Sequence, residues 1–277
     1  MKRLLPLHAA LVLLAFVPSG RSFGATETFA QRLVEGARRE AAARVLYDPS
    51  DFHMPYPRGD VPADIGACTD LVVRAFRWAG IDLQEEIHKD RLASPSLYPS
   101  NDQGESNPDP SLDHRRCRHL AVWFRRHALE LTTSAAPEDL DQWQPGDVVF
   151  FNLSDKPKER PDHVAIVSDR RLPGGMPFVI DNFPPGAAER FALVSFPVIH
   201  SHFRWPAQEP GQPIEPRYVA ATPHPWRARV PASLQASPTP VPLERPSAAR
   251  PSPSSRPIPL IRAQPIQKRR PVPETAI

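Results

Sequence analysis

The chain has 277 residues, of which 40% are hydrophobic and 23% are charged, so it can bury a sizeable core. Its formal net charge is only +3, and it contains neither a phosphate-binding glycine loop nor a dinucleotide-binding fingerprint, which argues against nucleotide and nucleic-acid binding. Only two residues are cysteines, Cys68 and Cys117, so any thiol chemistry must involve one of them.

Residues 1–24 have the composition of a secretory signal peptide. Lys2 and Arg3 form a basic start, and residues 4–17 form an apolar stretch that is too short and too interrupted for a good membrane span. Small residues precede a cleavage site after Gly24. We therefore expect an exported bacterial protein, periplasmic or secreted, with no transmembrane segment in the mature chain.

The C-terminal segment, residues 206–277, differs in composition from the rest of the chain. It holds 18 of the 37 prolines and ten Lys or Arg residues against four Glu, so its net charge is about +6 and that of the preceding part about −3. Proline fixes φ and removes backbone donors, so this segment is expected to be a disordered or extended polyproline tail. A basic tail favours polyanionic components of the cell envelope, although a solvated spacer is the simpler interpretation.

Residues 26–205 remain as one domain, and helical patterns dominate its first half. Apolar residues recur at spacings of three and four within residues 27–47, 68–79, 83–92 and 120–131. Gly80 follows the second pattern as a C-cap, whereas residues 48–66 and 94–112 are rich in loop-forming residues.

The second half of the domain contains short runs rich in Val, Ile and Phe, separated by Pro and Gly. These runs cover residues 146–153, 162–169, 177–182 and 198–205. A glycine-containing loop joins the second run to the third, so these two are expected to form a hairpin. Helices followed by strands indicate the α+β class, with an antiparallel sheet backing a layer of helices.

Cys68 lies where a helix start would activate a thiol. It opens the helical pattern of residues 68–79, where free backbone N–H groups and the helix dipole favour an anion, so its pKa is expected to be lowered. The alternative is a disulfide from Cys68 to Cys117, which an exported protein permits. The number of cysteines alone leaves both interpretations open.

A cysteine nucleophile needs a base that a third polar group orients. His163 opens the second strand, and Asp181 and Asn182 end the third. If these two strands pair as a hairpin, both ends meet at the same edge of the sheet. Asp181 or Asn182 would then lie beside His163.

Several motifs closely resemble a bacterial family known only as domain of unknown function 1287. They are ACTDLVVRAFRWAGIDLQEEIHKD, DHRRCRHLAVWFRRH, WQPGDVVFF, DHVAIVSDR, FVIDN and HSHFRW, in this order and at similar spacing over about residues 30–205. That family in turn looks like a branch of the NlpC-type cysteine peptidases, which have a papain-like fold and cut peptides of bacterial peptidoglycan. The resemblance implies a papain-like α+β domain with N-terminal helices packed on a small antiparallel sheet.

The resemblance also implies roles for the matching residues. Cys68 would be the nucleophile and His163 the base, and the third position falls at Asp181, with Asn182 adjacent. An upstream tyrosine that helps to polarise the site matches Tyr47. The family usually has His where this chain has Asp181, but a carboxylate can still orient an imidazole.

The oxyanion formed on attack is expected to rest on backbone N–H groups at the start of the Cys68 helix, with Thr69 and Tyr47 in support. The position of Cys117 is usually apolar in the family, so the resemblance does not imply a disulfide to the nucleophile.

Charged residues near the two helix starts are candidate substrate-binding groups. Asp113, His114, Arg115 and Arg116 form the run DHRR, which the resemblance places near the site. Either arginine could clamp a substrate carboxylate with its forked guanidinium, and Asp70 is a further candidate. The structural alternatives are an N-cap by Asp113 with solvated arginines, and a helix-dipole interaction of Asp70.

We expect no metal and no other cofactor. The chain has no HExxH run, and His114, Cys117 and His119 could meet around zinc only if their loop folded sharply.

The sequence thus predicts a thiol-dependent amide hydrolase, an endopeptidase or amidase, that acts on peptidoglycan stem peptides or on other peptides. The alternative is a non-catalytic cell-wall-binding module of the same fold, in which a Cys68–Cys117 disulfide consumes the nucleophile.

Overall fold

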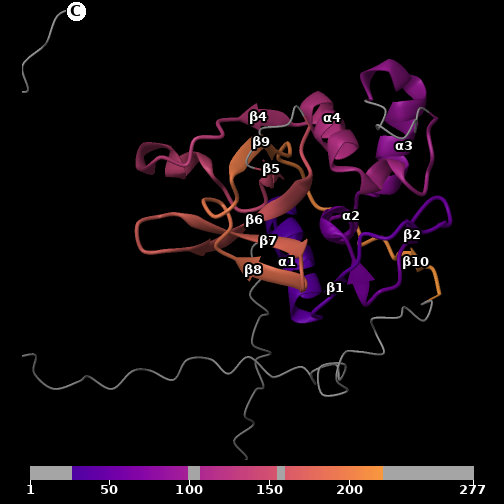
Figure 1. Cartoon of the computed structure of the whole chain (residues 1–277), viewed down its shortest axis with the longest axis horizontal. Coiled ribbons are helices and arrows are strands. Elements are labelled where there is room, and N and C mark those ends of the chain that lie inside the picture. The colour runs from indigo at the N-terminus through magenta and orange to yellow at the C-terminus, as the bar shows by residue number, and fades with distance from the viewer. Residues whose placement is uncertain (1–26, 99–106, 155–159, 221–277) are drawn as a thin grey trace, which may run out of the picture. The chain divides into compact units, whose positions relative to one another are not determined.

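The computed structural model describes residues 27–98, 107–154 and 160–220. Its strands are β1 Leu46–Tyr47, β2 Gly59–Asp60, β3 Ile65–Gly66, β4 Leu129–Leu131, β5 Val148–Asn152, β6 His163–Arg171, β7 Pro177–Phe183, β8 Gly186–Arg190, β9 Val198–Arg204 and β10 Arg217–Tyr218. Eight strands form one sheet in the order β3-β1-β8-β7-β6-β5-β9-β4 (Figure 1). Its pairings are antiparallel except for the parallel pair β1–β3, which confirms the α+β class with an antiparallel sheet.

The four α-helices follow the predicted patterns closely at their starts. They are α1 Phe29–Ala42, α2 Cys68–Trp78, α3 Leu83–Ala93 and α4 Cys117–His127, and short 3₁₀ turns cover η1 Pro95–Leu97, η2 Asp113–Arg115 and η3 Pro137–Gln142. Thr28 and Gln31 form a capping box at the start of α1. Gly80 lies just beyond α2 with a φ of +94°, a conformation that glycine adopts at no steric cost.

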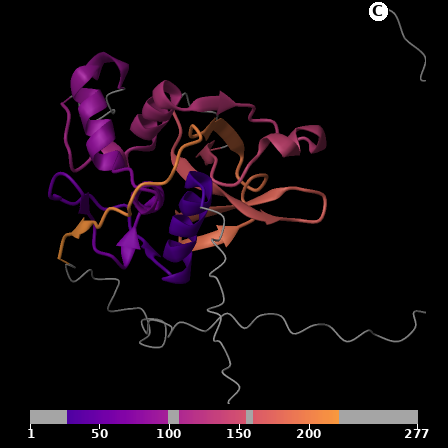
Figure 2. The ribbon, with the colours of Figure 1, turned by 180° about the vertical axis from the view of Figure 1, so that it is seen from behind.

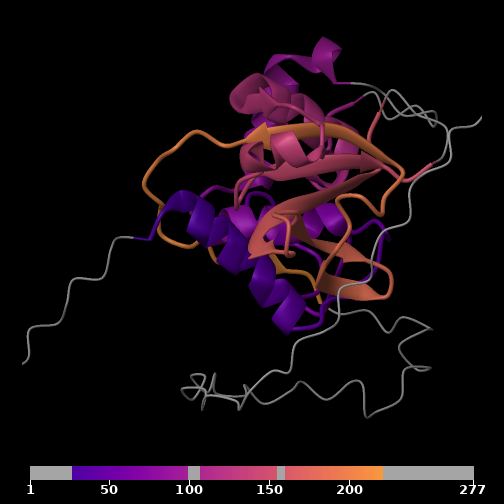
Figure 3. The ribbon, with the colours of Figure 1, turned by 90° about the vertical axis from the view of Figure 1, so that its left-hand side faces the viewer.

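The helices cover one face of the sheet and bury the larger core against it (Figures 2 and 3). Alternate strand residues such as Phe150 and Ile166 meet Phe76 of α2 and Phe124 of α4, and all four are fully buried. Alternation with a period of two places the intervening residues on the other face. There Val149 and Phe151 pack with Trp143 in a second core.

The structure corrects the predicted helix over residues 120–131. Helix α4 ends at His127, and Leu129 and Leu131 instead lie in β4, which pairs antiparallel with β9. Strand β8 was missed because its residues, GAAER, show no alternation of apolar and polar types.

Residues 206–220, which the composition assigned to the tail, are hydrogen bonded to the domain. The backbone N–H of Gly211 donates to the carbonyl of Ala79 over 2.9 Å, and β10 pairs in parallel with β2. The ring of Tyr218 also lies over the guanidinium of Arg74, 5.6 Å away. A proline-rich segment can form an edge strand because only the residues that face the neighbouring strand must donate a backbone N–H; the others can be proline.

The expected signal peptide and the rest of the expected tail, residues 221–277, lie outside the described residues. Among the helices of the described part, none is long and apolar enough to cross a membrane.

Candidate active site

Cys68 is the first residue of α2 and is 5% exposed. The carboxylate of Asp70 accepts a hydrogen bond of 2.6 Å from the backbone N–H of Ala67, which fixes the turn that leads into the helix. Cys68 thus opens the helix, as the sequence predicted, and the N–H groups of a first helical turn have no partner within the helix.

His163 and Asp181 meet at the ends of neighbouring antiparallel strands β6 and β7. The Nε2 atom of His163 lies 2.7 Å from Oδ2 of Asp181, and both side chains are buried. Asn182, the next residue, points to the opposite face and donates from Nδ2 to the carbonyl of Gly66 over 2.7 Å. Strand alternation therefore brings Asp181, and not Asn182, to the imidazole.

The surroundings of Cys68 and His163 shift the pKa values of both groups toward their charged forms. A hydrogen bond from Cys117 and the nearby imidazolium of His163 outweigh burial and lower the pKa of Cys68 from 9.0 to about 5. Burial alone would lower the pKa of His163, but the Cys68 thiolate and the hydrogen bond to Asp181 raise it from 6.5 to about 9. The site therefore favours thiolate and imidazolium between these values.

Cys117 brings a second thiol to the site. It is the first residue of α4, and its Sγ lies 3.7 Å from Sγ of Cys68, with both cysteines free. The hydrogen bond to Cys68 and burial raise the pKa of Cys117 well above its ordinary value, so Cys117 remains a thiol. The sequence interpretation considered Cys117 as a disulfide partner or as one of three possible zinc ligands, whereas here its S–H can donate to the Cys68 thiolate.

Tyr47 and Thr69, the two expected supports, differ in their surroundings. Burial, followed by electrostatic interaction with Cys68 and Cys117, raises the pKa of Tyr47 to about 12, so it stays a neutral phenol. The hydroxyl of Thr69 instead donates to the carbonyl of Arg115 over 3.4 Å. Thr69 thus ties α2 to the segment before α4.

The expected substrate-binding pair Asp70 and Arg115 is engaged within the protein. Arg115 donates to both carboxylate oxygens of Asp70, over 2.9 and 3.0 Å, and to the carbonyl of Ser50 over 2.6 Å. Burial disfavours the Asp70 carboxylate, but Arg115 outweighs it and lowers the pKa of Asp70. This buried pair joins the two helix starts. Because the guanidinium of Arg115 is already bound to Asp70, it cannot clamp a substrate carboxylate.

The remaining DHRR residues are also occupied or buried. Asp113 is fully buried and contacts His88 and Arg91. His114 is buried as well, and burial and the charge of Arg77 lower its pKa to about 3, so it is neutral. Arg116 makes a forked ion pair with the exposed Asp51 over 3.0 and 3.1 Å.

Arg190 of β8 is a site neighbour that the sequence interpretation missed. Its Nε lies 2.6 Å from Oδ1 of Asp181. Only the pairing of β7 with β8 brings it there, and no sequence motif marks it. On the same side, Phe183 and Phe196 pack edge-on to His163, with ring centroids 5.5 and 5.1 Å away.

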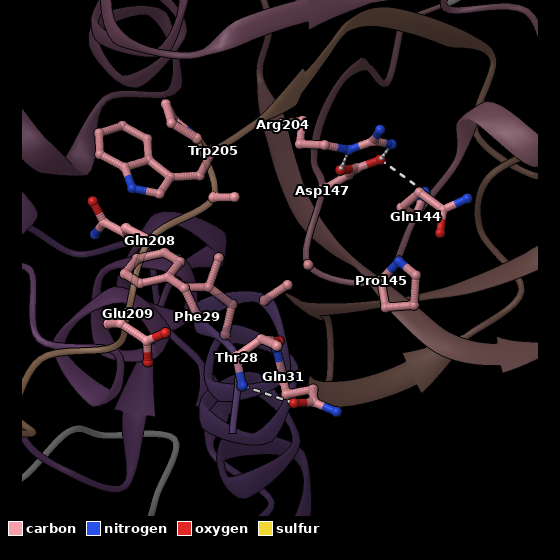
Figure 4. Close-up of a pocket in the computed structure, with 15 residues that line it drawn as sticks. Thr28, Phe29, Gln31, Gln144, Pro145, Asp147, Arg204, Trp205, Gln208 and Glu209 are labelled. Atoms are coloured by element: carbon pink, nitrogen blue, oxygen red, sulfur yellow. Dashed lines mark hydrogen bonds and ion pairs between the residues drawn. The ribbon is translucent and has the colours of Figure 1, made fainter. Parts of the chain in front are cut away.

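Beyond the cysteine site, the described part of the chain offers a pocket but no metal centre. There, no group of three or more His, Cys, Asp or Glu side chains could hold a metal ion. A pocket of about 810 Å³ lies between the start of α1 and the end of β9, and Phe29, Trp205 and the ion pair Asp147–Arg204 help to line it (Figure 4). Its lining includes neither Cys68 nor His163.

Comparison with known proteins gives two matches. The family described as "Domain of unknown function (DUF1287)" matches residues 34–205. The relative named "Uncharacterized protein YijF" from Escherichia coli (strain K12) is 35% identical over 173 residues, which cover 62% of this chain and 80% of the relative. No solved structure matches this chain.

Proposed function

The chain belongs to the DUF1287 family, and from the arrangement of Cys68, His163 and Asp181 we propose that it is a thiol-dependent amide hydrolase of the papain-like, NlpC type. The observation that carries this proposal is the contact of 2.7 Å between the imidazole of His163 and the carboxylate of Asp181 on the next strand, in a site where Cys68 opens α2 and where Cys117 and His163 lower the pKa of its thiol. A helix-borne thiolate, a strand-borne imidazole and a third polar group are the elements that cysteine hydrolases require.

The proposed reaction begins with the Cys68 thiolate attacking the carbonyl carbon of an amide. His163 gives its proton to the leaving amine, and a thioester to Cys68 remains. His163, now neutral, then takes a proton from water, whose oxygen attacks the thioester and releases the acid and the Cys68 thiolate. Asp181 holds the imidazole in one orientation through both steps, since it contacts Nε2 and leaves the other ring nitrogen for the sulfur.

The oxyanion of the tetrahedral intermediate would be stabilised by backbone N–H groups at the start of α2. These groups have no partner within the helix and point outward from its first turn. Tyr47 is a neutral phenol that interacts electrostatically with Cys68, and in this proposal it donates a further hydrogen bond. Thr69 donates elsewhere and has no part in this proposal.

For the substrate we propose the stem peptides of peptidoglycan. This choice depends on the resemblance to NlpC-type peptidases, on the signal-peptide composition of residues 1–24, and on the basic composition of the C-terminal segment. The charged groups expected to bind the substrate, Asp70 and Arg115, pair with each other, so their role in this proposal is to hold the two helix starts together.

The second candidate function is a cell-wall-binding module without catalysis. The short distance between the thiols of Cys68 and Cys117 supports this candidate, because a disulfide between them would remove the nucleophile. A separation of 3.7 Å is van der Waals contact, so a small movement would allow a disulfide that removes the nucleophile. The cysteines are free in the structure, which supports the hydrolase.

The test is digestion of defined stem-peptide fragments by the reduced full chain, followed by mass spectrometry of the products, with Cys68→Ser as the matched control. Cleavage that Cys68→Ser abolishes supports the proposal. Binding of the fragments by both proteins with no cleavage would favour the binding module. If neither binding nor cleavage occurs, although Cys68 is alkylated rapidly near pH 6, the stem peptides are the wrong substrate.

A further inference from the structure

The carboxylate of Asp181 is shared between two positively charged partners. Its Oδ2 faces Nε2 of His163 over 2.7 Å, and its Oδ1 lies 2.6 Å from Nε of Arg190. The contact with Arg190 lacks the alignment of a directed hydrogen bond, so it is an ion pair. Asp181 is completely buried, and its charge must therefore be compensated by these neighbours.

The backbone holds Arg190 in this place. In the pairing of β7 with β8, Asp181 lies opposite Ala188 and Val179 lies opposite Arg190, so Asp181 and Arg190 are diagonal neighbours on one face. The guanidinium also donates from Nη2 to the carbonyl of Gly186 over 2.7 Å. It lies over the ring of Phe183 at 5.9 Å and remains about a quarter exposed.

We propose that Arg190 is a positioning residue of the active site, which fixes the Asp181 carboxylate through the oxygen that His163 does not use. It completes a row of alternating charges from three adjacent strands and one helix: the Cys68 thiolate, the His163 imidazolium, the Asp181 carboxylate and the Arg190 guanidinium. This inference deepens the proposed function and rests on it for the role of the row in catalysis.

Arg190 has two effects on the charged pair. By neutralising part of the Asp181 charge, it limits how strongly the carboxylate holds the imidazolium proton, which His163 must give up to the leaving amine. By holding the Asp181 carboxylate in place, it also keeps the His163 imidazolium positioned to favour the thiolate of Cys68. Loss of the guanidinium should therefore raise the pKa of both reacting groups.

The test is the rate of iodoacetamide alkylation of Cys68 against pH, which needs no substrate. In Arg190→Gln we expect both transitions of the wild-type profile, near pH 5 and pH 9, to move upward by about half to one unit. Arg190→Lys should return both toward the wild-type positions because it restores the charge. The matched control is Arg170→Gln, which removes an exposed arginine that pairs with Glu189 on the neighbouring surface.

A double-mutant cycle with Asp181→Asn separates positioning from a general field effect. If Arg190 acts through the carboxylate, Arg190→Gln should cause a much smaller shift in the Asp181→Asn background. An unchanged profile in Arg190→Gln, or an equal shift in both backgrounds, overturns the inference.

A measurement on the wild-type protein keeps the inference testable if Arg190→Gln does not fold. The ¹⁵N resonance of Arg190 Nε should change with the same midpoint as the imidazole of His163, because Asp181 joins them. A chemical shift of Arg190 Nε that does not change through the His163 transition would overturn the inference. The proposed function fails separately, if wild-type Cys68 shows no rapid alkylation at low pH.

Discussion

Replacing His163 by Ala should move the alkylation midpoint of Cys68 upward from about pH 5. With the pKa of Cys68 at about 5, against 9.0 ordinarily, about 90% of the thiol is ionised at pH 6, compared with roughly 0.1% at the ordinary value. A thiolate of lower pKa is also a weaker nucleophile, by a factor of roughly 40 to 100 over four units. The net advantage of the intact site at pH 6 is therefore roughly ten- to twentyfold.

That factor is the upper limit for a single change. The largest contribution to the lowered pKa of Cys68 is the hydrogen bond from Cys117, which His163→Ala leaves in place. We therefore expect the midpoint of alkylation in His163→Ala to lie between about 5 and 9. The transition near pH 9, which belongs to His163, should disappear.

The assay is alkylation by iodoacetamide from pH 4 to 10, with the modified cysteine identified by peptide mass. His127→Ala is the matched control, because His127 is 40% exposed and pairs with Asp90 at the end of α4. Its profile should equal that of the wild type. If His163→Ala still alkylates with a midpoint near pH 5, His163 does not activate the thiol, and the charged pair is wrong.

Hydrolysis by the wild type should follow a bell-shaped pH profile. The pKa of Cys68 is lowered in the folded protein, so the reactive thiolate is lost as the pH falls through about 5. The pKa of His163 is raised, so the imidazolium that donates a proton to the leaving amine is lost as the pH rises through about 9. Activity measured outside this window at its full rate would contradict the thiolate–imidazolium pair.

The remaining predictions concern the second thiol, the buried ion pair and the domain boundary. Cys117→Ala should raise the alkylation midpoint of Cys68, and it should prevent the loss of two mass units that we expect when hydrogen peroxide oxidises the two thiols to a disulfide and water. Asp70→Asn should lower the free energy of unfolding in urea by about 3 kcal/mol, because it removes the forked carboxylate partner of the buried Arg115 and leaves it the exposed Asp51 at 3.8 Å. Truncation after residue 205 should lower the Tm by roughly 3 °C or more relative to truncation after residue 220, because it removes β10.

Each of these predictions has its own contrary result. A Cys117→Ala protein with the wild-type alkylation profile would show that the second thiol does not stabilise the first. For the buried pair, the control is Glu130→Gln, which breaks an exposed pair with Arg125 and should cost under about 1 kcal/mol. If Asp70→Asn lowers the free energy of unfolding by no more than Glu130→Gln does, the ion pair of Asp70 and Arg115 is not buried. Equal Tm values for the two truncations would show that residues 206–220 add no stability.

The parts of the site that sequence predicted well depend on local patterns. The helical spacing after Cys68 predicts a helix start at that residue, and α2 begins there. The apolar runs that begin at His163 and end at Asp181 and Asn182 predict a hairpin, and β6 pairs with β7 as expected. These features follow from periods of 3.6 and two residues, which adjacent positions along the chain encode.

Only the structure of the sheet shows whether Asp181 or Asn182 orients His163. Both residues lie near the end of β7, and only the alternation of side chains along the strand shows that Asp181 shares a face with His163 while Asn182 reaches Gly66. The expected substrate clamp is a related case. Arg115 has a buried partner in Asp70, from a helix start 45 residues earlier, and no local pattern reports such a pairing.

The sequence by itself determined the elements of this protein: a thiol at a helix start, a histidine at a strand start, an α+β order of segments and a change of composition near residue 206. Tertiary structure decided which side chains face one another across those elements: the second thiol of Cys117 against Cys68, and Arg190 against Asp181. The physical reason is that propensity and periodicity act between neighbours in the chain. Contacts between helix starts and between adjacent strands depend on packing and register, which only the folded chain defines.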